Sequence, residues 1–72
     1  MIIQITTHDG KTKPVSVHKT KAELYTQIIE IARLRLENEP RAQKKSLCRE
    51  IALRTSATER TVYRVLTDIY EL

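Results

Sequence analysis

The chain has 72 residues, of which 40% are hydrophobic and 31% charged, and its 13 Lys and Arg against 9 Asp and Glu give a net charge of +4. A chain this short forms one domain and buries only about 60% of the surface of its unfolded form. That excludes a two-domain enzyme and a deep cofactor cleft. Without Phe or Trp, the core has to be built from Ile, Leu, Val and Ala. The basic balance favours an anionic partner such as nucleic acid.

Cysteine usage and the first residues favour a reducing, cytoplasmic location. Cys48 is the only cysteine, so no intrachain disulfide forms, and we expect a buried, unreactive thiol. The opening apolar run, Met1 to Ile3, is far shorter than a signal peptide or a membrane span requires. The two histidines show no metal-ligand spacing relative to the cysteine. We therefore expect no metal, no cofactor, no catalytic residue and no enzyme activity.

Residues 1–19 have the pattern of a β-hairpin. Two runs that are β-branched or alternate with period two flank the dipeptide Asp9-Gly10, a strong turn signal. A two-residue turn would place Ile3 opposite a serine and mix the two faces. A three-residue loop with a left-handed Gly10 pairs Ile3 with Val15 and keeps the apolar face together. We therefore predict the three-residue loop.

Residues 20–38 predict one long helix. Thr20 suits its N-cap, and Glu23 three residues later completes a capping box. Apolar residues then recur at helical spacing: Leu24, Tyr25, Ile28, Ile29, Ile31, Ala32 and Leu36. This face is wider than one surface helix needs. It either covers both the hairpin and the next helices or leaves area for a second protomer.

Residues 40–72 predict two further helices. Pro40 suits the first turn of a helix over residues 41–54, and a second helix over residues 58–71 follows a short break. The residues expected to face inward are Leu47, Cys48, Ile51, Ala52, Val62, Val65, Leu66 and Ile69. The predicted fold is a single α+β domain, mainly helical, with an N-terminal hairpin, a long helix and a C-terminal helix pair that together give a three-helix core.

The window from Cys48 to Thr67 has the spacing of two helices that meet at a steep angle. Ala52 is small where the helices touch, Ser56 is small at the tight turn, and Ile51, Val62 and Val65 close the space between them. This window resembles the helix-turn-helix of bacterial and phage DNA-binding regulators. The stretch Thr61-Val62-Tyr63-Arg64-Val65-Leu66 is similar to the recognition helix of the lac-repressor family.

The window departs from that family in two ways. Ser56 stands where such motifs most often carry Gly, and a left-handed backbone there would be costly for serine. The lac-repressor family also places the motif at the start of the chain, whereas here it lies at the end.

The resemblance implies that the helix over residues 58–71 enters the major groove with its N-terminal end first. Arg64 matches the family's arginine and is the best candidate to read guanine O6 and N7. Further base contacts are expected from Arg60, Tyr63 and Glu59; alternatively, Glu59 caps the helix with Ser56. Phosphate contacts are expected from Thr58, Thr61, Lys44, Lys45, Arg49 and Thr67.

The charge distribution supports this interpretation independently of any family. Residues 1–40 carry six basic and five acidic side chains, whereas residues 41–64 carry seven basic and two acidic ones. Positive charge is thus concentrated on the segment expected to meet phosphate.

From these features we expect a small regulator of transcription or replication, such as a repressor, that binds double-stranded DNA at a promoter or origin. Its size is typical of phage or plasmid control proteins. One recognition helix covers few base pairs, so a homodimer on a two-fold site is expected. We expect no membrane partner and no small-molecule effector.

The alternative is a protein-interaction module, antitoxin-like or inhibitory, that uses the hairpin edge or the helix face over residues 21–36. RNA binding is less favoured, because no paired aromatics offer a stacking surface.

Overall fold

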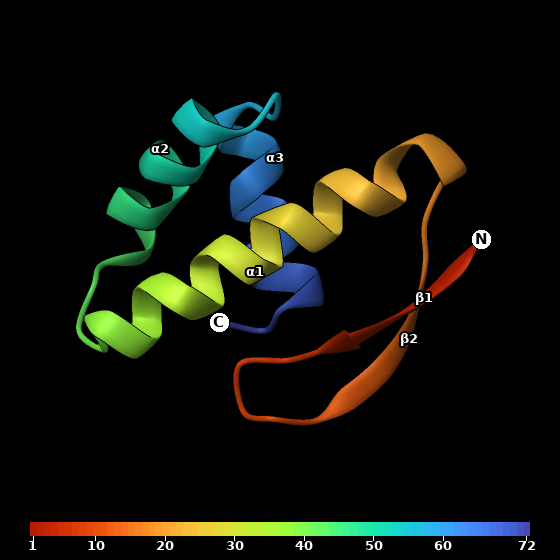
Figure 1. Cartoon of the computed structure of the whole chain (residues 1–72), viewed down its shortest axis with the longest axis horizontal. Coiled ribbons are helices and arrows are strands. Elements are labelled where there is room, and N and C mark those ends of the chain that lie inside the picture. The colour runs from red at the N-terminus through yellow and green to blue at the C-terminus, as the bar shows by residue number, and fades with distance from the viewer.

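A computed structural model describes all 72 residues as a two-stranded antiparallel hairpin followed by three helices (Figure 1). The elements are β1 (Ile2–Thr6), β2 (Thr12–Ser16), the 3-10 turn η1 (Lys19–Lys21), α1 (Ala22–Asn38), α2 (Lys44–Arg54), α3 (Glu59–Arg64) and the π turn η2 (Val65–Ile69), which continues α3. This order confirms the predicted α+β, mainly helical class. In Figure 1, α1 crosses in front of the last turn of the chain, with α2 and the hairpin on opposite sides. None of the helices has both the length and the apolar composition to cross a bilayer.

The hairpin has the predicted register. Ile3 pairs with Val15, and Gly10 adopts a φ of +91°, which only glycine tolerates readily. The Thr7 N–H donates to the Lys11 carbonyl at 2.7 Å and closes a three-residue loop. The apolar face of the hairpin therefore stays together, as the parity of the loop requires.

The prediction that Thr20 is the N-cap of the long helix is wrong. His18, with extended backbone angles, is the cap residue of η1, and its Nδ1 accepts from the Thr20 N–H at 3.3 Å. Thr20 therefore lies inside this first turn, and α1 begins after Lys21 without a side-chain cap. The capping box with Glu23 does not form. The histidine takes the capping role because the end of the hairpin delivers it, two residues earlier, in the extended conformation that a cap needs.

The helix α2 begins later than predicted. The Ala42 N–H donates to the Glu39 carbonyl at 3.0 Å, so Pro40 occupies the second position of a turn rather than the first turn of a helix. Proline is favoured at both places, because both need its fixed φ. Gln43 then precedes the helix with an extended backbone. The predicted start at residue 41 is therefore wrong by three residues.

The last helix ends earlier than residue 71 and is not regular throughout. The Tyr70 N–H donates to the Val65 carbonyl at 2.9 Å, five residues back, which is the π pattern. The Leu72 N–H reaches the Leu66 carbonyl at 2.9 Å around Glu71, which has a φ of +60°. A left-handed residue closes the helix here as in a Schellman cap, but the closing bond spans six residues instead of five. The extra residue in the turn rotates Tyr70 inward, where it is 3% exposed.

The hairpin is attached to this C-terminal turn as well as to α1. The His8 N–H donates to the Tyr70 carbonyl at 2.8 Å. The rings of the same two residues pack edge to face, with their centroids 5.7 Å apart. Lys13 Nζ donates to the Asp68 carbonyl at 3.2 Å and pairs with Glu71. The hairpin thus holds the end of the helix pair in place.

One core connects all these elements. Its cluster of twelve buried residues comprises Ile5, Ile28, Ile29, Ala32, Leu36, Leu47, Cys48, Ile51, Val62, Val65, Leu66 and Tyr70. Four of these belong to α1, so its wide apolar face is used by the hairpin on one side and the helix pair on the other. The exposed apolar residue of α1 is Leu34.

Candidate nucleic-acid interface

The turn between α2 and α3 is tight and is stabilised by threonine hydroxyls. The Thr55 hydroxyl donates to the Ile51 carbonyl at 2.9 Å and accepts from the Ala57 N–H at 3.3 Å. Thr58, whose polar side chain suits the position, is the N-cap of α3, and its hydroxyl accepts from the Thr61 N–H at 3.2 Å. These short-range bonds hold the two helices of the predicted helix-turn-helix at a defined angle.

Two alternatives that concern Ser56 are settled by this geometry. Ser56 has no positive φ, so serine carries no left-handed strain in this turn. Because Thr58 is the cap, a capping box between Ser56 and Glu59 does not form. Glu59 instead lies 3.5 Å from Arg49 of α2. Both groups are exposed, so this pair adds little stability.

The outward face of α3 carries two arginines four residues apart. Arg60 and Arg64 are exposed, and neither guanidinium lies within ion-pair distance of a carboxylate. Thr67 is exposed further along the same side. Residues four apart lie on one face of a helix, so this face presents to solvent two arginines that form no ion pair.

On the side of α3 that faces α2, the predicted contact residues meet one another. Lys44 Nζ lies 4.6 Å from the centre of the Tyr63 ring, a cation–π distance, and 3.5 Å from the Leu72 carbonyl oxygen. Glu59 pairs with Arg49, as described. Tyr63 remains 52% exposed. Lys44 is half-buried and therefore less accessible than the sequence alone indicated.

On the other side of α3, a groove of about 500 Å³ separates it from the hairpin and the start of α1. Arg64, Thr61 and Asp68 line one wall of this groove, and Ser16 and Lys21 line the opposite wall. Thr61 is half-buried, and its hydroxyl accepts from that of Thr58 at 3.1 Å. Sequence reasoning missed Lys21, because only the packing of α1 against η2 brings it to this groove.

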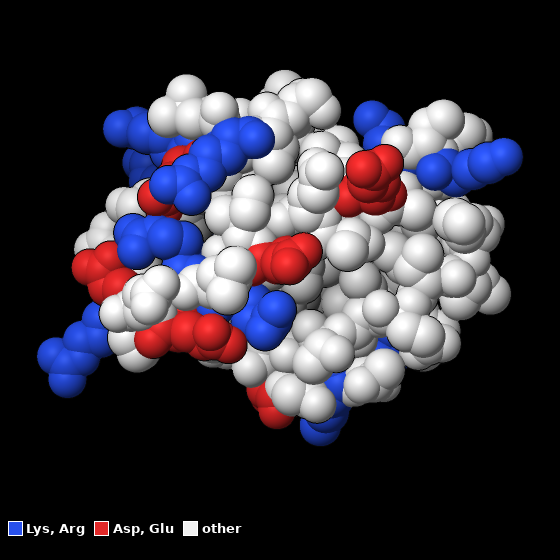
Figure 2. Space-filling model, in the orientation of Figure 1, with Lys and Arg blue, Asp and Glu red and all other residues white.

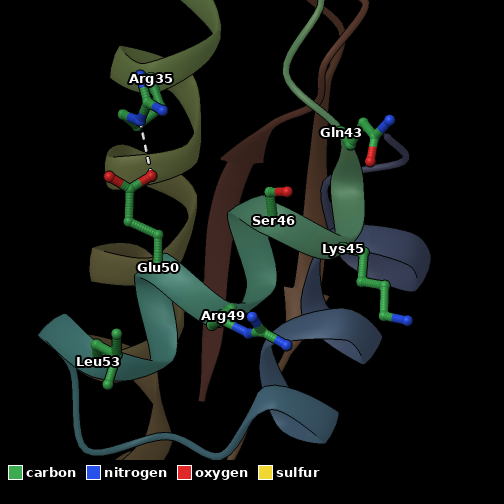
Figure 3. Close-up of a pocket in the computed structure, with 7 residues that line it drawn as sticks. All are labelled: Arg35, Gln43, Lys45, Ser46, Arg49, Glu50 and Leu53. Atoms are coloured by element: carbon green, nitrogen blue, oxygen red, sulfur yellow. Dashed lines mark hydrogen bonds and ion pairs between the residues drawn. The ribbon is translucent and has the colours of Figure 1, made fainter.

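The outer surface of α2 forms a hollow beside α1 (Figure 3). Arg35 of α1 donates through Nε to Glu50 of α2 at 2.7 Å. In Figure 3, Lys45 and Arg49 extend away from α1, toward the side of α2 where α3 lies. Lys45 is exposed and forms no ion pair. The basic side chains of α2 and α3 thus border a common surface.

The ion pair between Arg35 and Glu50 is expected to make the folded state less stable at acidic pH. The hydrogen bond from Arg35 lowers the pKa of Glu50 below its ordinary value of 4.5. A carboxyl group with a lowered pKa in the folded state contributes stability above its ordinary pKa and loses it as the pH falls through the lower value. We expect the unfolding temperature of the wild type to fall below pH 4.5 more steeply than that of Glu50→Gln.

The control for this melting series is Glu37→Gln. Glu37 lies 3.5 Å from Arg33 and is more exposed than Glu50, so its pair is weaker. This variant should keep the wild-type dependence on pH. If Glu50→Gln also kept the full acid-induced loss of stability, the pair would have no such role.

The single thiol, Cys48, is poorly placed to act as a nucleophile. Cys48 is buried against the core, 4% exposed, and burial raises the pKa of its thiol. A thiol that resists ionisation is a poor nucleophile. Its position confirms the prediction of a buried cysteine.

No protein-family model, curated protein or solved structure matches this chain.

Proposed function

We propose that this chain is a sequence-specific double-stranded DNA-binding protein, a small regulator of transcription or replication that places α3 in the major groove. The observation that carries the proposal is the outward face of α3, where Arg60 and Arg64 are exposed and lack acidic partners. Elsewhere, arginines on the helices are engaged: Arg33, Arg35, Arg49 and Arg54 all pair with carboxylates. Unpaired arginines on a short exposed helix are suited to guanine and phosphate.

The spacing of the two arginines fits the base-pair stack. Four residues of helix advance about 6 Å, which corresponds to roughly two base-pair steps of 3.4 Å. Arg64 is proposed to bind guanine O6 and N7, with Arg60 reading a neighbouring pair. Tyr63 and Glu59 lie on the side that faces α2, so they reach base edges at the border of the contact, where Glu59 can exchange Arg49 for a cytosine amine.

Phosphate contacts are proposed around this face. Thr58 lies at the N-terminal end of α3, where the helix dipole favours an anion, and Thr61 and Thr67 extend along the helix. On α2, Lys45 and Arg49 border the same surface, and Lys44 contributes positive potential from its position over Tyr63. Binding at a promoter or origin then acts by occupying the site, as in a repressor.

The alternative function, a protein-interaction module, would use either the hairpin edge or the apolar face of α1. The centre of the apolar face of α1 is already buried in the core of the chain, through Ile28, Ile29, Ala32 and Leu36. A protein partner would therefore use the hairpin edge rather than the helix face.

The proposal is tested by the salt dependence of duplex binding, measured by fluorescence anisotropy with a labelled duplex of mixed sequence. Lys45→Gln should weaken binding to every duplex about equally and reduce the slope of log K against log salt by about 1, because one phosphate contact is lost. The matched control is Arg33→Gln, whose side chain pairs with Glu37 on α1. Equal effects of the two substitutions would contradict an interface on α2 and α3.

A further inference from the structure

The two edges of the hairpin differ in what they offer. The Val17 N–H donates to the Met1 carbonyl at 2.9 Å, and the Thr7 N–H donates to the Lys11 carbonyl at 2.7 Å. In an antiparallel pair, residues whose backbone N–H and C=O groups bond to the partner strand alternate with residues whose N–H and C=O groups point away from it. The odd-numbered residues of β1 therefore bond to β2, and the N–H and C=O groups of Ile2, Gln4 and Thr6 point to the outer edge.

The outer edge of β2 is blocked. Pro14 lies opposite Gln4 and has no N–H to offer a further strand. The groove beside Val15 and Ser16 is bordered on its far side by α3 and η2. Proline on an edge strand is a common protection against strand addition.

The outer edge of β1 has no such protection. Its five residues, Ile-Ile-Gln-Ile-Thr, include no charge and no proline. Met1 is 66% exposed and Ile2 69% exposed, two of the five large apolar side chains that the molecule leaves in solvent. Figure 2 shows few charged side chains on the hairpin side of the molecule in this view, whereas acidic and basic groups crowd over α2 and the second half of α1. An open, uncharged edge with exposed apolar groups is a site for strand pairing.

We propose that β1 pairs antiparallel with β1 of a second copy of this chain, around a two-fold axis at Gln4, to form a four-stranded sheet of order β2-β1-β1-β2. This register places Gln4 opposite Gln4 of the partner subunit and Ile2 opposite Thr6 of the partner subunit. Each outward donor then meets an outward acceptor, which a two-fold interface requires.

The occupant is a second copy because the surface is complementary to itself. The edge carries no charge that would oppose its own image. The hollow that adjoins it, between β1 and α1, carries one acid, Glu30, and one base, Arg33, and so presents no net charge to its copy. The exposed Ile2 would gain apolar cover from the added strand.

The size of the edge sets the strength of the dimer. Two strands of five residues bury less than the roughly 1,200 Å² of a standard stable interface. We therefore expect a weak, concentration-dependent dimer in the absence of DNA. This dimer is independent of the proposed DNA binding.

Charge substitution at the two-fold axis tests this pairing, with sedimentation equilibrium over a wide concentration range and without DNA. The wild type should pass from monomer to dimer as concentration rises. Gln4→Lys and Gln4→Glu should each remain monomeric at the concentration where the wild type is half dimeric, because like charges stand directly opposite each other. An equal mixture of the two variants should restore the dimer as a heterodimer.

The matched control is Thr12→Lys, on the outer edge of β2, which should dimerise like the wild type. Circular dichroism of each variant verifies that the hairpin and helices are retained. A wild type that stays monomeric at all concentrations, a Gln4→Lys variant that dimerises fully, or a mixture that stays monomeric would each overturn the proposal. None of these outcomes bears on DNA binding, which the salt titration tests separately.

Discussion

Ile51→Ala is expected to lower the free energy of unfolding by about 2–5 kcal/mol, because it removes three buried carbons and leaves a cavity. Ile51 is fully buried between α2 and α3, in the cluster that includes Leu47 and Val62. A domain of 72 residues has a total stability of about 4–11 kcal/mol at roughly 0.05–0.15 kcal/mol per residue. The substitution therefore removes a large fraction of the total, and urea unfolding measures it.

The same helix provides the matched control. Leu53 lies two residues away and is 83% exposed. Leu53→Ala should change the free energy of unfolding by no more than about 0.5 kcal/mol, since an exposed leucine loses little on truncation. Similar losses for Leu53→Ala and Ile51→Ala would mean that the packing described between α2 and α3 is wrong.

The second large effect is expected at Arg64. Arg64→Ala should remove the preference for one guanine in the binding site, because a bidentate contact to O6 and N7 contributes about 1–3 kcal/mol of discrimination. That corresponds to roughly 5- to 150-fold between guanine and another base at that position. Competition between duplexes that differ only at this base pair measures the ratio.

The control for this competition is Arg54→Ala. Arg54 is an exposed arginine at the end of α2 and pairs with Glu50 at 3.5 Å. It carries the same charge but lies outside the face of α3, so its loss should leave the guanine preference intact. A variant at Arg54 that lost the preference, or one at Arg64 that kept it, would show that Arg64 does not read this base.

Much of the fold was predictable because local signals agreed with one another. The parity of the Asp9-Gly10 loop fixed the pairing of Ile3 with Val15, since only that register joins the apolar residues on one face. The spacing of apolar residues gave three helices and nearly all of the core. Thr58 was identifiable as a cap from its polar side chain before an apolar-periodic run.

The parts that could not be predicted depend on contacts between distant segments. Pro40 fits a turn and a helix start equally well, and only the connection from α1 to α2 selects the turn. Thr20 competes with His18 for the cap, and the exit of the hairpin decides between them. The π turn η2 shifts the helical phase, so Tyr70 is buried although its spacing did not mark it as core.

In the candidate site, too, some features could be predicted from local sequence and others depend on contacts between distant segments. The outward face of α3 followed from periodicity, which places Arg60, Arg64 and Thr67 in solvent. The neighbours of that face did not follow from periodicity. The pairing of Arg49 with Glu59 depends on how α2 packs against α3, and the position of Lys21 across the groove from Arg64 depends on how α1 packs.

Selection of binding sites from a random duplex DNA library, followed by sequencing, at two salt concentrations tests whether α3 reads DNA sequence. We expect an enriched motif that contains a guanine, and we expect the preference for this guanine to disappear when Arg64→Ala is selected in parallel. A two-fold arrangement of the motif would be consistent with the dimer. Uniform weak binding without an enriched sequence, abolished by salt, would show only a basic surface and would contradict sequence-specific recognition by α3.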